Sequence, residues 1–150
     1  MTCLLFVASL SDYDLTLSID ELRSSNSDTR KEINRMKDAL DLFRTLINWK
    51  KKNYINIKYN KTELIQTVEE TLLFDKVSVI LFLNKEDLFE EKFRRSTLKI
   101  CFNDYVETDS SEEAKRFIAE KFLECDRSNN HSLDKRDIYW HYTFALGNLF

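Results

Sequence analysis

Along this chain of 150 residues, short continuous apolar runs take turns with segments in which apolar residues recur at helical spacing. Residues 4–7 and 77–83 are short, nearly continuous apolar runs, which are typical of strands covered on both faces of a parallel sheet. Residues 138–145 are rich in aromatic and β-branched side chains and predict a third strand. The chain is therefore expected to contain three strands.

Two amphipathic helices are predicted between these strands. Apolar residues recur at helical spacing over residues 33–47 and again over residues 114–122. A capping-box pattern precedes each helix, at residues 29–32 and 110–113. The order strand, helix, strand, helix, strand predicts an α/β fold.

Two polar segments interrupt this order. Residues 15–28 lack periodicity and predict a loop. Residues 50–62 are biased toward Lys, Asn, Ile and Tyr, and we expect a solvated loop there rather than a basic patch for nucleic acid or acidic partners. A third interpretation of this block is A/T-rich noncoding DNA translated from a retained intron.

The chain contains one glycine, Gly147, and no proline. Phosphate-binding loops need glycine because their backbone N–H groups must approach the anion closely. Neither G-x-x-x-x-G-K-[ST] nor G-x-G-x-x-G can occur in this sequence. These 150 residues therefore contain no phosphate loop.

The charge balance gives a net charge of −3, which provides no global field to attract nucleic acid or anionic lipid. No apolar run approaches the ~18 residues of a membrane-spanning helix. We therefore predict neither nucleic-acid binding nor a transmembrane segment. Cys3, Cys101 and Cys125 lack C-x-x-C spacing, which favours reduced thiols in a cytosolic setting over disulfides or a zinc site.

The most specific motif is Asn84-Lys85-Glu86-Asp87, directly after the predicted strand at 77–83. In open α/β sheets, ligands bind beyond the carboxyl ends of the strands. The Asp87 carboxylate can accept both N1–H and the N2 amino group of guanine, a donor pair that adenine lacks. Asn84 can donate to N7 or O6, and the Lys85 methylenes can cover the ring. The motif predicts guanine binding; the alternative is that Asp87 only caps the following helix.

A wider resemblance extends from this motif. Residues 83–92, Leu-Asn-Lys-Glu-Asp-Leu-Phe-Glu-Glu-Lys, resemble the alpha subunits of heterotrimeric G proteins, and so do residues 5–14. Residues 34–36 and 139–146 look like two further parts of that family, a helix and the last guanine loop. The resemblance covers roughly residues 3–14, 33–47 and 72–146.

This resemblance implies that residues 1–150 are a partial Ras-like (P-loop GTPase) domain, with three mainly parallel strands and flanking helices. It implies GTP or GDP as the ligand, bound with Mg²⁺ in the family. Asn84, Lys85 and Asp87 would contact the guanine with their side chains, and Ala145 with its backbone.

The resemblance also implies partners and a location. The family works with beta-gamma subunits, seven-helix G-protein-coupled receptors and effectors, in the cytoplasm at the inner face of the plasma membrane. Residues 15–32 would be a variable loop of this fold. Residues 50–71 would be an insertion, because the family joins the preceding helix to the next strand by a much shorter turn.

The chain also departs from the family. The phosphate loop, the catalytic switch Arg and Gln, and the magnesium-binding Ser and Thr have no counterpart here, so we predict no catalytic residue and no metal ligand. The last loop reads Thr143-Phe144-Ala145-Leu146, where the family usually has Thr-Cys-Ala-Thr. The chain alone is expected neither to hold GTP tightly nor to hydrolyse it.

Two other functions stay open. The first is a noncatalytic protein-interaction fragment, whose unpaired sheet edges and open apolar faces would require a partner. The second is a degenerate EF-hand at residues 126–137, which offers oxygen ligands but has His131 where glycine is needed and Asp137 where glutamate is needed. A polar connection is the favoured interpretation of that segment. Asp12 and Asp14 are similarly interpreted as loop residues rather than as an acid/base pair.

Overall fold

The structure is a computed structural model that describes residues 3–19, 31–59, 63–72, 74, 77–126 and 136–144. Its centre is a parallel three-stranded sheet in the order β1–β6–β7. These strands are β1 (Cys3–Ser9), β6 (Ser78–Asn84) and β7 (Ile138–Thr143). The three predicted strands and the α/β fold are therefore confirmed.

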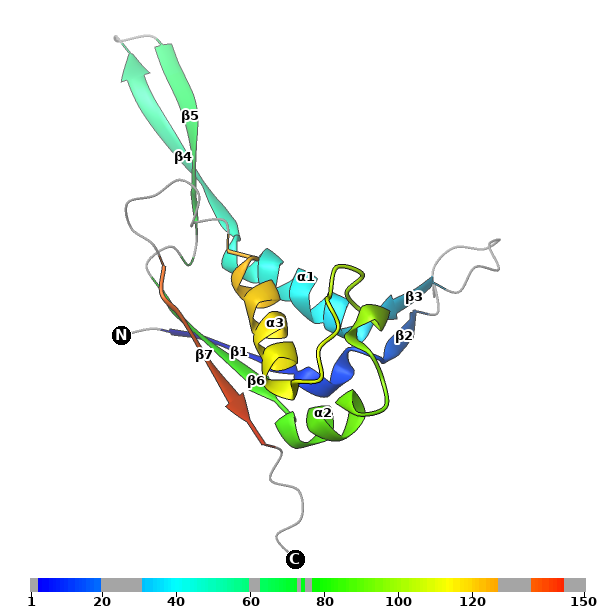
Figure 1. Cartoon of the computed structure of the whole chain (residues 1–150). Coiled ribbons are helices and arrows are strands. Elements are labelled where there is room, and N and C mark those ends of the chain that lie inside the picture. The colour runs from blue at the N-terminus through cyan, green and yellow to red at the C-terminus, as the bar shows by residue number, and fades with distance from the viewer. Residues whose placement is uncertain are drawn as a thin grey trace, which may run out of the picture.

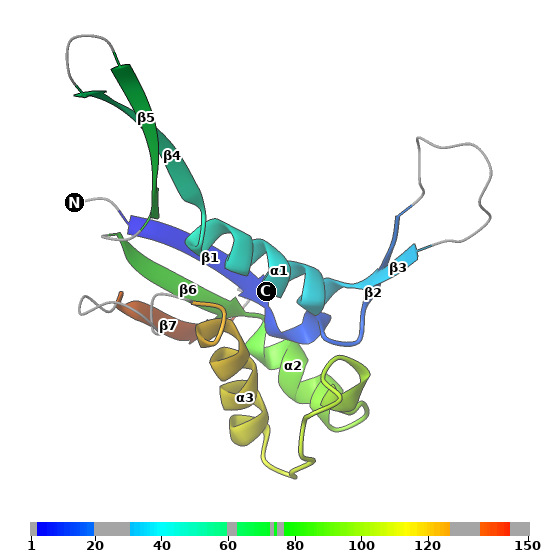
Figure 2. The same cartoon turned by 90° about the horizontal axis from the view of Figure 1, so that it is seen from above.

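One face of the sheet carries the helices. Figures 1 and 2 show α1 (Arg35–Ile47) and α3 (Ser111–Leu123) together on this face, while α2 (Glu86–Phe93) follows the carboxyl end of β6. Every second residue of a strand points to the same side. Accordingly, Val79, Leu81 and Leu83 of β6 are fully buried beneath the helices.

Three phenylalanine rings from three elements form the centre of the core. The ring of Phe43 on α1 lies 4.9 Å from that of Phe6 on β1 and 5.5 Å from that of Phe122 on α3, measured between centroids. The rings are tilted or edge-on to one another, as aromatic quadrupoles prefer. The sheet and both long helices are thereby joined through one aromatic cluster.

Two antiparallel hairpins replace the expected loops. Their strands are β2 (Thr16–Ile19) with β3 (Lys31–Asn34), and β4 (Lys50–Tyr59) with β5 (Glu63–Leu72). The loop prediction is therefore wrong for residues 16–19 and 50–59. Strand prediction from sequence relies on a periodic pattern of apolar residues that face the core. These polar segments lack that pattern, and pairing between their strands orders them instead. In Figure 1 the β4–β5 hairpin projects away from the sheet.

Asn34 caps the start of α1. Its Oδ1 accepts the first-turn N–H groups of Met36 and Lys37 at 3.0 and 3.2 Å, and its Nδ2 donates to the carbonyl of Tyr13 at 2.6 Å. The predicted capping box at residues 29–32 is wrong, because Glu32 belongs to β3 and Thr29 lies outside the described residues. The cap falls where the extended backbone ends.

The predicted N-cap of α3 at Ser110 is confirmed, but the reciprocal bond of a capping box is not formed, because the Ser110 N–H bonds Thr108 Oγ1 at 3.1 Å. Ser110 Oγ accepts the Glu113 N–H at 3.3 Å, and the Glu113 carboxylate accepts the Thr108 hydroxyl at 2.6 Å. Ile118 and Phe122 are fully buried on the predicted apolar side of this helix.

The other face of the sheet carries no helix among the described residues. Leu5, Ile80 and Tyr139 are register neighbours on this face, and Val7 and Phe82 form the next row. The side chains of Leu5 and Val7 are 54% and 56% exposed. Parallel sheets normally bury both faces, so this exposed apolar row favours association.

Truncation of the central ring should destabilise the fold strongly. Phe43→Ala removes a fully buried ring that contacts both the sheet and α3, and we expect it to cost about 3–5 kcal/mol of unfolding free energy. Leu42→Ala, one residue away and 52% exposed, is the matched control and should change this free energy by less than about 1 kcal/mol. Urea denaturation measures both, and equal losses would contradict this view of the core.

The uncovered sheet face should limit solubility. Replacing Leu5 and Val7 together by lysine should raise the concentration at which light scattering first appears, because both side chains already face solvent. Phe6→Lys on the same strand is the control and should unfold the chain, since it buries an unpaired ammonium. Unchanged scattering in the double variant would show that this face does not drive association.

Candidate guanine-recognition site

The candidate site residues lie where β6 and β7 end. Asn84 is the last residue of β6 and is the register partner of Thr143, the last residue of β7. Because the strands are parallel, their carboxyl ends meet at one edge of the sheet. Lys85 and Asp87 continue from β6 at that edge, whereas Ala145 lies outside the described residues.

The backbone turns sharply at Lys85. Its φ of 62° and ψ of 44° lie in the left-handed region, and it is the only non-glycine residue with positive φ in the described part of the chain. This conformation is costly for a residue with a Cβ and is concentrated at functional sites. Asn84 supports the turn, because its Oδ1 accepts the Lys85 N–H at 2.7 Å. The Phe89 N–H closes the first helical turn onto the Lys85 carbonyl at 3.0 Å.

The following helix, α2, is anchored to the loop after β1. Phe89 is fully buried, with its ring edge-on to that of Tyr13 at 5.7 Å between centroids. Lys92 Nζ donates to the carbonyl of Ser11 at 2.9 Å and to the Asp14 carboxylate at 2.6 Å. The segment that carries Asp87 is therefore held against a second part of the sheet edge.

Asp87 lies in the first turn of α2, where its charge suits the helix dipole. Its side chain is exposed and makes no hydrogen bond or ion pair with any other described residue. The alternative that Asp87 caps the helix is wrong, because α2 begins at Glu86 and Lys85 occupies the N-cap position. The carboxylate is thus available to a ligand.

A buried ammonium next to the motif was missed by sequence reasoning. The side chain of Lys115 on α3 is 0% exposed and pairs with Glu86, Glu90 and Glu112. Its Nζ also lies 5.1 Å from the centroid of the Tyr142 ring on β7. The signal that could have revealed it is a lysine three residues before Ile118, on the buried stripe of an amphipathic helix.

Electrostatics keep this ammonium charged. Burial pulls the pKa of Lys115 down, but the hydrogen bonds that its ammonium donates to Glu112, Glu86 and Glu90 outweigh burial and raise the pKa above its ordinary value of 10.5. Burial also raises the pKa of Tyr142, and the Glu112 charge adds to this effect. The cluster is therefore an ionic contact between α2 and α3 with the aromatic ring of β7 beside it.

Asp12 and Asp14 are engaged in structural contacts. Asp12 accepts the Ser9 hydroxyl at 2.8 Å and pairs with Arg35 at 3.3 Å, while Asp14 pairs with Lys92. Each carboxylate holds the loop after β1 against a neighbouring element. This agrees with their interpretation as loop residues.

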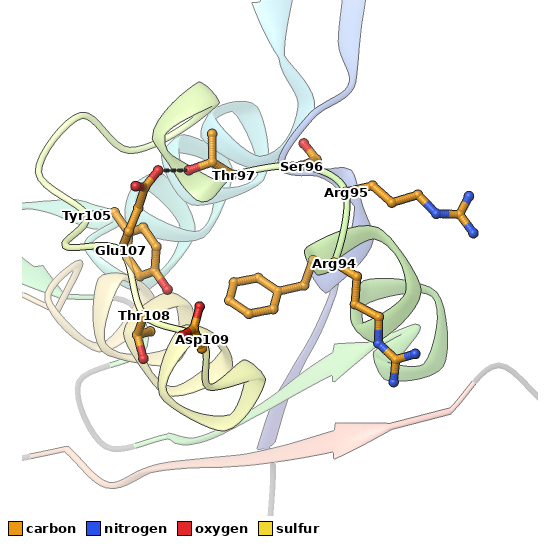
Figure 3. Close-up of a pocket in the computed structure, with 9 residues that line it drawn as sticks. Arg94, Arg95, Ser96, Thr97, Tyr105, Glu107, Thr108 and Asp109 are labelled. Carbon is orange, nitrogen blue, oxygen red and sulfur yellow. Dashed lines mark hydrogen bonds between the residues drawn. The ribbon is translucent and has the colours of Figure 1, made fainter.

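One groove among the described residues lies at the carboxyl end of α2, away from the motif. It has a volume of about 700 Å³ and is bordered by residues 93–97, by Tyr105 and by residues 107–109. Figure 3 shows Thr97 donating to Glu107, with Arg95 pointing away from that pair. Neither Asn84, Lys85 nor Asp87 lines this groove. This groove is therefore not a binding site formed by the motif.

The remaining sequence candidates can be placed as follows. Of the proposed calcium loop, Asp126 is buried and residues 127–135 lie outside the described residues; strand β7 follows the segment instead of a helix. The three cysteines are free, and burial raises the pKa of the Cys101 thiol to about 11. Among the described residues, no helix is long and apolar enough to cross a bilayer.

The charged state of Lys115 predicts a pH dependence. Its raised pKa adds stability that is fully present below pH 10.5 and is lost as pH rises toward the folded-state pKa. The difference in unfolding free energy between wild type and Lys115→Met should therefore be constant from about pH 8 to about pH 10 and then shrink. Guanidinium denaturation at each pH measures it. A difference that stays constant to about pH 11.5 would contradict this assignment.

The chain matches the model of a known protein family. The model of the family described as "G-protein alpha subunit" matches residues 60–148 of this chain. The matched region is more than half of the chain and includes β6, α2, α3 and β7, hence the whole Asn84–Asp87 motif and its buried lysine.

Proposed function

The chain belongs to the G-protein alpha subunit family, and from this premise we propose that it carries the guanine-specificity half of a signalling GTPase domain. Family membership gives the chain a place in G-protein signalling and identifies its sheet and helices as a partial Ras-like α/β fold. The observation that carries the proposal is the register pairing of Asn84 with Thr143. It brings the motif at the end of β6 and the last residue of β7 to one edge of the sheet.

The side chains of the motif support recognition of guanine. Asn84 already uses its Oδ1 for the Lys85 N–H, so its amide nitrogen remains to donate to N7 or O6 of the base. Asp87 is exposed at the start of α2, ready to accept N1–H and the N2 amino group. The Lys85 methylenes would cover the ring, and the Ala145 backbone would complete the contact from the β7 side.

Hydrolysis is not part of the proposed function. These 150 residues have no glycine-rich phosphate loop, and phosphate contacts supply most of the charge-assisted binding in this class of site. GTP or GDP would therefore bind weakly, through the base. The Mg²⁺ used in the family has no fitting site among the described residues: the carboxylate group formed by Glu86, Glu90 and Glu112 already surrounds the Lys115 ammonium.

The partners proposed for the chain follow from its family. They are the beta-gamma subunits, a G-protein-coupled receptor and effectors, at the cytoplasmic face of the plasma membrane. A second candidate function is a noncatalytic interaction fragment. The exposed apolar side chains of Leu5, Val7 and Tyr139 favour this second function, because a sheet face of this kind gains stability when a partner covers it.

Guanine recognition can be tested by NMR titration of the labelled chain. Addition of GMP should shift the amide signals of residues 84–87, with a Kd of about 1 mM. Addition of AMP should leave these signals in place. Asp87→Ala removes two charge-assisted hydrogen bonds and should lower the GMP affinity at least about tenfold. Glu91→Ala, one turn further along α2 and exposed, is the matched control and should leave it unchanged.

Three outcomes would count against the proposal. Equal shifts with GMP and AMP, or none with either, would show that the motif does not read guanine. Turnover of labelled GTP above the buffer blank, abolished by Asp87→Ala, would contradict the predicted lack of hydrolysis.

A further inference from the structure

Lys115 contacts two of the elements that border the candidate guanine site, α2 and β7. It projects from α3 and pairs with Glu86, the third residue of the motif, and with Glu90 one turn later on α2 at 3.2 Å. The Tyr142 ring that faces it belongs to β7, one residue before the end of that strand. A single side chain therefore joins the loop after β6 to the end of β7.

Because this ammonium is buried, losing any of its partners would be costly. A buried lysine is expensive unless its charge is paired and its three protons are bound. Here the carboxylates of Glu86, Glu90 and Glu112 supply three acceptors, and the Tyr142 ring face supplies a fourth favourable contact. If the motif loop moved away, Lys115 would lose its Glu86 partner inside the protein. Loop movement is thus penalised by the cost of an incompletely paired buried charge.

The loop needs such a support. Lys85 adopts the left-handed conformation without being glycine, and the only described side chain that stabilises its N–H is that of Asn84. Asp87, which must meet two donors at once, has no described partner that would fix its direction. Glu86 lies between these two residues, so holding its carboxylate restricts both neighbours.

We propose that Lys115 is the positioning residue of the guanine site. By binding Glu86 and contacting the Tyr142 ring, it holds the start of α2 next to the end of β7. The side chains of Asn84 and Asp87 then stay at the separation needed to contact one guanine base. This inference rests on the proposed function for its ligand, but the mechanical role of Lys115 is independent of any nucleotide. Lys115 itself does not touch the base. It acts through Glu86 and Tyr142.

Amide hydrogen exchange without nucleotide tests this role directly. The N–H groups of Lys85 and Phe89 are hydrogen-bonded within the motif turn, and that of Met36 is bonded to the distant cap of α1. Lys115→Met keeps the length of the side chain and removes its charge. It should accelerate exchange at Lys85 and Phe89 by about tenfold or more, with Met36 nearly unchanged. Lys115→Arg should restore most of the protection because it keeps the charge.

The matched control is Lys121→Met on the same helix. Lys121 also pairs with two carboxylates, Asp104 and Glu124, but these lie away from the motif. This variant should leave exchange at Lys85 and Phe89 at the wild-type rate. Buffers contain EDTA, because removal of the ammonium leaves three carboxylates whose ligand atoms lie within 4.8 Å of one another.

A second variant covers the case in which Lys115→Met does not fold. Glu86→Gln keeps an oxygen acceptor but removes the charge, and it should accelerate the same two amides to a smaller extent. If exchange at Lys85 and Phe89 rises no more than at Met36 in the folded variants, the positioning role is overturned.

The GMP titration separates this inference from the proposed function. In Lys115→Met the GMP affinity should fall about tenfold, while Lys121→Met should bind as wild type does. If the wild-type chain shows no GMP shift, the proposed function fails, and the exchange rates still decide the role of Lys115. If wild type and Lys115→Met bind GMP equally well, guanine recognition stands and the positioning role falls.

Discussion

The pairing of β6 with a strand on each side is the constraint on which the rest of the structure depends. β6 is in parallel register with β1 along Cys3 to Ser9 and with β7 along Ile138 to Thr143. Val79, Leu81 and Leu83 then enter the core, and the motif that follows must emerge beside the end of β7. A register shift of one residue would turn the apolar set to the other face and move the motif away from Thr143.

Held in that register, α2 is fixed by contacts to two neighbours, the loop after β1 and the helix α3. Phe89 packs on Tyr13, Lys92 bonds to Ser11 and Asp14, and Glu86 with Glu90 bonds to Lys115. The first contact is apolar and the other two involve charged side chains, so salt and pH affect mainly the latter two. Recognition of a base needs side chains that are already in place, since each freely rotating group reduces the affinity gained per contact.

The family assignment and the open sheet face have complementary implications. The matched region holds the Asn84–Asp87 motif proposed for base recognition, whereas these 150 residues contain no glycine-rich phosphate loop. At the same time, Leu5 and Val7 expose an apolar row that a parallel sheet normally covers. Tight nucleotide binding and a covered sheet would each need surfaces that the described elements do not supply. The β4–β5 hairpin, by contrast, is ordered by its own strand pairing.

Local patterns in the sequence determined the sheet strands, the two long helices, the Ser110 cap and the position of the motif after a buried strand, because these features depend on periodicity and on neighbouring residues. Tertiary structure alone decided the rest. The hairpin at Thr16–Ile19 and Lys31–Asn34 replaced the expected capping box, because pairing between strands distant in sequence overrides a local signal. Only folding could reveal the buried charge of Lys115, because three carboxylates from two helices and a ring from a strand must meet before an ammonium can leave water.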